Sequence, residues 1–316
     1  MPPLSSVITA HRQLWADLAL LSVAAIWGAT FVMVRDAVST FPVFAFLAVR
    51  FVLATIALLP LAWREKADGW LNRRLIAQGG LMGLALFAGY GFQTMGLRYT
   101  TPAKAGFITG LSVVLVPAAS ALLLRRPPTR AAAIGIALAT GGMALLSLNA
   151  DLSIGLGDLL VLACAVSFAG QIVLTAAFAP GQPTLHLTCV QIAMVALTSG
   201  AIALAGERPW PPMSGQVFFA AVFTGVLATS FAFATQTAAQ RFTSPTHTAL
   251  IFSLEPVFAA LFSFFLIGET LTGRAVAGCS LILAGMLTAE LGDLIWQGLS
   301  PRRRIARMSR EQPREM

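Results

Sequence analysis

Two ionisable side chains stand inside long apolar stretches, Arg50 in the second stretch and Glu255 in the ninth. A guanidinium stays charged, and charge near the bilayer centre is costly, so we expect Arg50 to face protein or water. It either contacts an anionic group of a ligand or ties helices together. Desolvation disfavours a charged carboxyl group, so Glu255 is a candidate for proton coupling or for binding an amine. Alternatively, its carboxyl group fixes a helix that Pro256 interrupts.

Aromatic and amide side chains form a second group of candidates. Trp27 and Phe31 are four residues apart on one helical face, and with Thr30 they would give the aromatic wall and hydroxyl that suit an organic ligand. The alternative is ordinary helix packing. Further candidates would either line the same cavity or bridge helices, and these are Tyr90, Gln93, Gln171 and Gln236.

The chain offers little for catalysis. Its three histidines lie in unrelated places, and the apolar stretches hold no pair of acids and no nucleophile beside a base. No Gly-x4-Gly-Lys-Ser/Thr phosphate-binding loop occurs, so the sequence gives no support for transport driven directly by ATP. Cys164, Cys189 and Cys279 have neither metal-ligand spacing nor a disulfide framework. We therefore expect no enzyme, no catalytic residue, no metal and no cofactor.

The composition indicates which elements position these residues. Of 316 residues, 57% are hydrophobic and 11% charged, and the mean hydropathy is +0.79. Soluble proteins carry about 25% charged residues, so a soluble module and a disordered chain are excluded. A polytopic membrane protein remains. The net charge of +8 comes mostly from arginines between apolar stretches and in the tail, which is typical of topogenic charge and not of nucleic-acid binding.

A bilayer core of about 30 Å requires about 20 apolar residues of helix. Charges, prolines and glycines divide the chain into ten such stretches, with linkers too short for a soluble domain. The predicted spans are 17–35, 42–62, 74–97, 103–124, 130–149, 156–178, 184–205, 215–240, 246–267 and 274–296.

The loop charges predict the orientation. With the N-terminus inside, 15 Lys and Arg residues fall on the inner side and 5 on the outer side, while Arg50 lies within a span. Cytoplasmic loops carry the excess of Lys and Arg. Both termini are therefore predicted to be cytoplasmic, with 1–16 as an N-terminal segment and 297–316 as a basic tail.

The two halves of the chain are similar in sequence. Shifting residues 93–148 by 143 overlays them on 236–291 without a gap, and 17 of the 56 positions are identical. Earlier in each half a shift of 141 pairs Trp27 with Phe168 and Arg50 with Gln191. Because each unit holds five spans, an odd number, the second unit must insert upside down. The predicted units are 17–149 and 156–296, and inverted repeats of this kind are a transporter architecture with a central site.

The motifs in this order resemble the ten-helix EamA-type members of the drug/metabolite transporter superfamily. The resemblance runs from about Leu18 to Leu291 and is carried by Ala25–Phe31, Val49–Phe51, Gly157–Leu159, Leu254–Val257 and Gly268–Thr272. It implies an all-helical membrane protein with ten helices around a central cavity, which moves small organic metabolites, amino acids or drugs. It also implies a multi-pass protein of the bacterial inner membrane.

We therefore expect a secondary transporter, an exporter by the tendency of the family, that works by alternating access. Its partners would be a small-molecule substrate and the lipid bilayer, with proton coupling through Glu255 and no nucleic acid. The alternatives are a membrane-embedded enzyme, a lipid-linked sugar flippase and a non-transporting receptor. The sequence does not decide the substrate or the oligomeric state.

Overall fold

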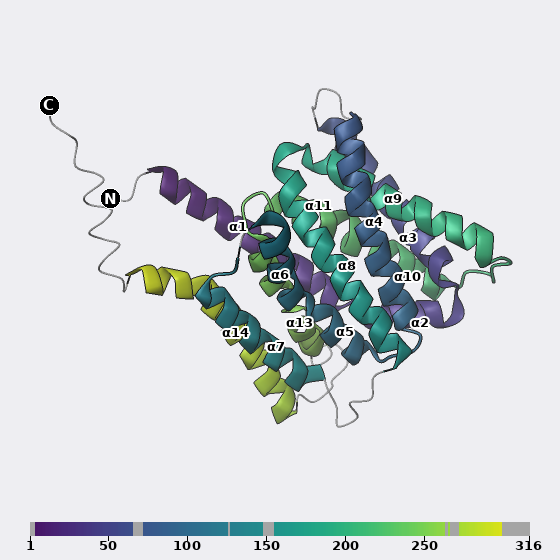
Figure 1. Cartoon of the computed structure of the whole chain (residues 1–316). Coiled ribbons are helices and arrows are strands. Elements are labelled where there is room, and N and C mark those ends of the chain that lie inside the picture. The colour runs from purple at the N-terminus through teal and green to yellow at the C-terminus, as the bar shows by residue number, and fades with distance from the viewer. Residues whose placement is uncertain are drawn as a thin grey trace.

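The computed structural model describes residues 4–65, 72–125, 127–147, 155–262, 265 and 272–298, and the regular elements among them are helices. Figure 1 shows them gathered into one bundle. The first half contains α1 (Leu4–Gly28), α2 (Phe31–Thr40), α3 (Val43–Arg64), α4 (Arg73–Gly96), α5 (Pro102–Gly110), α6 (Ser112–Leu124) and α7 (Arg130–Ser147).

The second half begins with α8 (Leu156–Phe178), a 3-10 turn at Ala179–Gly181, and α9 (Thr184–Gly206). It continues with α10 (Gly215–Gly225), a π-helical segment η2 (Val226–Phe231), α11 (Ala232–Ala239), α12 (Pro245–Phe252), α13 (Glu255–Phe262) and α14 (Gly273–Gly298). Several elements are pieces of one interrupted helix. When these pieces are joined, the described part of the chain has ten helical segments, as the apolar stretches predict.

The bundle has the surface of a membrane protein. In the described part, seven helices are long and apolar enough to cross a bilayer, and Arg130–Leu145 and Gly273–Ala289 are shorter apolar helices. Large apolar side chains are exposed on the outside, including Leu122 at 81% and Leu197 at 70%. Such a surface would be unstable in water and suits acyl chains.

The first helix differs from its prediction. α1 begins at Leu4, well before the expected start of the span at residue 17, because the sequence from Leu4 to Asp17 contains no glycine or proline to stop it. The helix is then interrupted at Ala29 and Thr30 and resumes as α2. The expected tail, 297–316, lies outside the described residues except for the last two residues of α14.

Two spans are interrupted at equivalent positions. A turn at Leu111 separates α5 from α6, and Ser253 and Leu254 separate α12 from α13. The shift of 143 pairs Leu111 with Leu254. Both helices also start alike, because a hydroxyl residue caps a proline-initiated first turn: Thr101 accepts a hydrogen bond from the amide of Lys104 at 3.2 Å, and Ser244 from that of His247 at 3.1 Å. The internal repeat therefore extends to helix caps and helix breaks.

The last spans of the two units, α7 and α14, lie side by side (Figure 1) and show that the units are inverted. A Cβ atom added to Gly135 would lie 2.5 Å from the carbonyl oxygen of Gly285, and one added to Gly142 would lie 2.6 Å from that of Gly278. Gly135 is the repeat equivalent of Gly278, and Gly142 that of Gly285. Each glycine thus packs on the equivalent of the other, which requires the two helices to run antiparallel.

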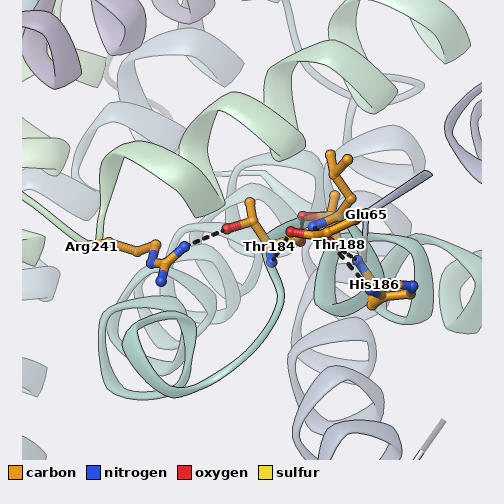
Figure 2. Close-up of polar contacts among 6 residues, drawn as sticks. Glu65, Thr184, His186, Thr188 and Arg241 are labelled. Carbon is orange, nitrogen blue, oxygen red and sulfur yellow. Dashed lines mark hydrogen bonds and ion pairs between the residues drawn. The ribbon is translucent and has the colours of Figure 1, made fainter. Parts of the chain in front are cut away.

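The second spans of the two units, α3 and α9, are joined at both ends by carboxylates. Glu65, just after α3, accepts hydrogen bonds from the amides of Thr184 at 3.1 Å, Leu185 at 2.9 Å and His186 at 3.3 Å, and its Oε2 lies 3.2 Å from Nδ1 of His186 (Figure 2). Arg241 donates to the hydroxyl group of Thr184 at 3.1 Å. Glu65 therefore satisfies the free amides at the start of α9.

Glu207 makes the same arrangement at the other end of the pair. It follows α9 and accepts hydrogen bonds from the amides of Phe44 at 3.1 Å and Ala45 at 2.8 Å, at the start of α3. Pro42 and Pro183, which precede the two helix starts, are equivalent under the shift of 141. The α3–α9 pair is therefore antiparallel and held together by reciprocal caps.

Candidate functional site

One cavity lies between the two units. It contains about 780 Å³ of empty space, with the space at its opening included. The lining residues come from both units and are Trp27, Thr30, Phe31, Val34, Arg50, Tyr90, Gln93, Leu97, Gly106, Thr109, Gly110, Ser112, Phe168, Gln171, Ile172, Phe233, Gln236, Phe252, Glu255 and Pro256.

The lining follows the internal repeat. Equivalent positions face the cavity in pairs, which are Trp27 with Phe168, Thr30 with Gln171, Phe31 with Ile172, Tyr90 with Phe233, Gln93 with Gln236, Thr109 with Phe252 and Ser112 with Glu255. The rings of Tyr90 and Phe233 meet edge to face with their centroids 6.1 Å apart. The pseudo-two-fold axis therefore passes between these two rings, through the cavity.

The aromatic contacts on either side of this axis are also equivalent. Tyr90 contacts Phe168 at 5.2 Å between centroids, and Phe233 contacts Trp27 at 5.5 Å. Trp27 contacts Phe252 as well, at 4.8 Å. Such pairs add about 0.5–1.5 kcal/mol each beyond the burial of their area. The rings thus form a connected wall across both units.

Arg50 lies on α3 and is 2% exposed. Its Nε donates to the hydroxyl group of Thr229 at 3.0 Å, and an Nη atom donates to the hydroxyl group of Tyr90 at 3.3 Å. The guanidinium carbon lies 4.5 Å from the centre of the Tyr90 ring and 5.5 Å from that of Phe51. Arg50 forms no ion pair with any described residue, so its charge is stabilised by hydroxyl groups and ring faces.

The π-helical segment η2 lies directly behind this part of the cavity. The indole nitrogen of Trp27 donates to the carbonyl oxygen of Ala228 at 2.8 Å, and Thr229, the partner of Arg50, donates to the carbonyl oxygen of Thr224 at 2.8 Å. A π-helical turn leaves carbonyl groups available to partners outside the helix. It therefore fixes the orientation of Trp27 and of Arg50.

Glu255 is the first residue of α13, directly after the break at Ser253 and Leu254. α1 passes close by, because a Cβ atom added to Gly28 would lie 2.7 Å from the carbonyl oxygen of Glu255. The side chain is partly exposed and has no hydrogen bond or ion pair within the described residues. In particular, Glu255 and Arg50 line the same cavity without pairing with each other.

Four buried glutamines form a network beside the cavity. Gln236 donates to Gln171 at 3.0 Å and to Gln240 at 2.8 Å, Gln171 donates to Gln191 at 3.1 Å, and Gln240 donates to the carbonyl oxygen of Ile172 at 3.0 Å. The side-chain oxygen of Gln236 is buried and has no donor among the described residues. Gln93 instead bonds Thr109 at 3.2 Å. The amide groups therefore join α8, α9 and α11 and leave one acceptor unused.

All nine sequence candidates lie on the lining of this cavity, namely Trp27, Thr30, Phe31, Arg50, Tyr90, Gln93, Gln171, Gln236 and Glu255. Whether they bind substrate stays a prediction. The sequence did not single out the lining residues Phe168, Phe233, Phe252 and Ser112. The internal repeat could have identified three of them, because they are equivalent to sequence candidates. Phe168, Phe233 and Ser112 are the equivalents of Trp27, Tyr90 and Glu255.

The lining can hold an organic molecule by its apolar body and bind its polar groups at a few points. Within the described ranges, no group of three or more His, Cys, Asp or Glu side chains could hold a metal ion. The aromatic wall, one carboxyl group and one guanidinium are features of a binding site.

Comparison with known proteins places the chain among transporters. The EamA-like transporter family matches residues 14–148 and again residues 155–289. An uncharacterized transporter of Archaeoglobus fulgidus is 35% identical over 280 residues, which cover 89% of this chain and 87% of the relative. The uncharacterized transporter YyaM of Bacillus subtilis is 26% identical over 285 residues, 86% of this chain and 92% of the relative.

A solved crystal structure has the same fold. It superposes with a TM-score of 0.74 at 22% sequence identity, over 87% of this chain and 98% of that structure. The two matched repeats, the inverted ten-helix bundle and the shared cavity agree with one another. The chain belongs to the EamA-like transporter family and is a multi-pass membrane transporter with two repeated domains, not an enzyme.

Proposed function

We propose that the protein is a secondary transporter that works by alternating access and binds its substrate in the cavity between the units. One observation carries this proposal: equivalent positions of two inverted units line a single cavity. In such a protein each unit can take up the conformation of the other, and the shared site then opens to the opposite side of the membrane. The interruptions at Thr30, Leu111 and Leu254 lie beside the cavity and are suitable places for helices to bend.

The lining residues have distinct proposed roles. The rings of Trp27, Phe31 and Tyr90 contact the apolar body of the substrate, and Thr30, Gln93, Gln171 and Gln236 offer polar contacts. Arg50 stabilises the site through Tyr90 and Thr229. The ionisable groups on the lining are Arg50, Tyr90 and Glu255. Of these, Glu255 is proposed to exchange a proton during transport, since its carboxyl group has no partner among the residues that the structure describes.

The substrate is proposed to be a small organic metabolite, amino acid or drug, and the direction to be export from the cytoplasm of a bacterial cell. With both termini cytoplasmic, topology reporters fused after Ala150 and at the C-terminus would report opposite sides of the membrane. The same side for both would contradict the proposed orientation.

The proposal is tested by profiling metabolites in cells that lack the protein and in cells that overproduce it. Export predicts that at least one small organic compound falls inside the overproducing cells and rises in their medium. The reverse change for the same compound would show import, and identical profiles in both strains would contradict transport of cellular metabolites.

A further inference from the structure

The two charged groups of the cavity differ in how far the protein already satisfies them. Arg50 is 2% exposed, donates to Thr229 and Tyr90, and lies with its guanidinium carbon 4.5 Å from the centre of the Tyr90 ring. Its charge is surrounded by protein groups. Glu255 faces the same cavity, is partly exposed, and has neither a hydrogen bond nor an ion pair within the described ranges. The ionisable group of the site that lacks a partner is therefore an acid, which is negative when it is ionised.

The repeat shows that the fold does not require a carboxyl group at the position of Glu255. The position equivalent to Glu255 is Ser112, which opens α6 as Glu255 opens α13 and also lines the cavity. The same helix break thus forms with a small neutral residue. The carboxyl group of Glu255 has no counterpart in the other unit, which folds with Ser112 at this position. Such a difference is expected of a group that contacts a ligand.

The walls of the cavity favour a cation as well. Trp27 contacts Phe252 with centroids 4.8 Å apart and Phe233 at 5.5 Å, both in tilted arrangements, and all three line the cavity. Ring faces attract cations, more strongly where water is excluded. An unpaired carboxylate between apolar walls is costly, and a positively charged ligand removes that cost.

We propose that the site selects organic amines, with Glu255 pairing with the ammonium group and the aromatic wall holding an apolar or aromatic body. This rests on the proposed transport function and names the substrate class for the same cavity. An organic anion would have only Arg50 as its cationic partner, which is 2% exposed and already uses two of its five N–H donors on Thr229 and Tyr90. Preference should therefore fall from amine to zwitterion to anion.

Three compounds with the same phenyl ring and different charges test this ranking. They are 2-phenylethylamine, phenylalanine and 3-phenylpropionate, each titrated into the purified full-length protein in lipid nanodiscs, with binding measured by calorimetry. The amine is expected to bind most tightly. Equal binding of all three, a preference for the zwitterion or the anion, or no binding of the amine would each overturn the proposal.

Two substitutions identify the residue responsible. Glu255→Gln keeps the size of the side chain and removes its charge, and it should weaken amine binding about 30-fold or more, as loss of one partner of a desolvated charge pair does. Glu255→Asp should restore part of that loss. Asp36→Asn, at an exposed acid of α2 outside the cavity, is the matched control and should bind like the unmodified protein. Full amine affinity in Glu255→Gln would overturn the proposal.

The two proposals fail separately. The ranking on the unmodified protein decides the substrate class even where Glu255→Gln does not fold. A protein that binds anions or zwitterions best, yet changes the metabolite profile of cells, remains a transporter with a different substrate class. If the amine binds but no compound is transported, the proposal of an amine site stands and the proposed transport function fails.

Discussion

Glu65 and Glu207 each cap the helix that the other one follows. Glu65 ends α3 and binds the first amides of α9, while Glu207 ends α9 and binds the first amides of α3. The two carboxylates lie at opposite ends of one antiparallel helix pair that joins the units. Because both ends are held at once, α3 and α9 are expected to move as one body, and the conformational change is expected in the interrupted helices around them.

Replacement of either glutamate should destabilise the protein. Glu65→Gln and Glu207→Gln each remove the charge from an oxygen pair that accepts backbone hydrogen bonds, at an expected cost of about 1–3 kcal/mol. The two sites are at opposite ends of the pair, so the double variant should lose the sum of the two single effects. Thermal unfolding of the purified protein in detergent measures both. Asp36→Asn is the control, and a Tm unchanged in both glutamine variants would refute the role of the caps.

The α7–α14 contact offers a prediction with an internal control. Gly135→Ala places a Cβ atom 2.5 Å from the carbonyl oxygen of Gly285, so the helices must separate, and we expect a loss of about 1–3 kcal/mol. Gly141→Ala is in the same helix, and its Cβ atom meets nothing within 4 Å. It should be neutral or should stabilise by up to about 1 kcal/mol. Comparison of the two Tm values decides, and equal values would contradict the close packing.

Tyr90→Phe should destabilise the protein and reduce transport without abolishing it. The substitution removes the hydroxyl group that accepts from Arg50 at 3.3 Å and keeps the ring 4.5 Å from the guanidinium carbon. An unsatisfied donor then costs about 1–3 kcal/mol. We expect a lower Tm and reduced transport, and a larger loss of both in Tyr90→Leu, which removes the ring as well. Equal effects of the two substitutions would show that the ring face contributes nothing.

Glu255→Gln should abolish proton coupling, so that any substrate movement that remains after the loss of amine affinity no longer responds to a pH gradient. An amide of the same size cannot take up a proton in the physiological range. Transport of the compound found by metabolite profiling is measured in proteoliposomes with and without a pH gradient. In the unmodified protein the gradient should accelerate transport, and in the variant it should not. Full pH-driven transport in Glu255→Gln would rule out its role in coupling.

Much of the fold could be predicted from the sequence, because the signals are local and repeated. Apolar stretches of span length between charges and turn residues predict ten helices, and the ungapped shift of 143 predicts two units. The odd number of spans in each unit makes the second inverted. These inferences depend on chain composition, bilayer thickness and loop charge, and not on any particular contact.

Apart from the interrupted ninth span that Pro256 suggested, the helix breaks and the long-range caps could not be predicted. Glu65 and Thr184 are 119 residues apart, and nothing near either residue indicates that they meet. The break before Glu255 precedes the proline that suggested an interrupted helix, and the π-helical segment at Val226–Phe231 contains no proline or glycine. Partners outside the helix determine these features, such as Trp27 at the carbonyl oxygen of Ala228.

The candidate site was predictable to the extent that polar residues are rare in apolar helices. Arg50, Glu255 and the glutamines stand out for that reason, and each candidate lines the cavity. Phe233 and Phe252 did not stand out, because phenylalanine is common in the chain, with 21 residues. The hydrogen bonds of Arg50, and the lack of a partner for Glu255 in the described part of the chain, are three-dimensional facts that no single sequence reveals.

Passage of substrate through the cavity between the units is the proposed route across the membrane. It is tested most directly by substrate flux in proteoliposomes that carry Ser112→Cys as the sole cysteine, with Cys164, Cys189 and Cys279 replaced, before and after reaction with a bulky maleimide. Ser112 lines the cavity, so the account predicts saturable flux that is lost when this position is modified. Flux that continues unchanged after complete modification would contradict it.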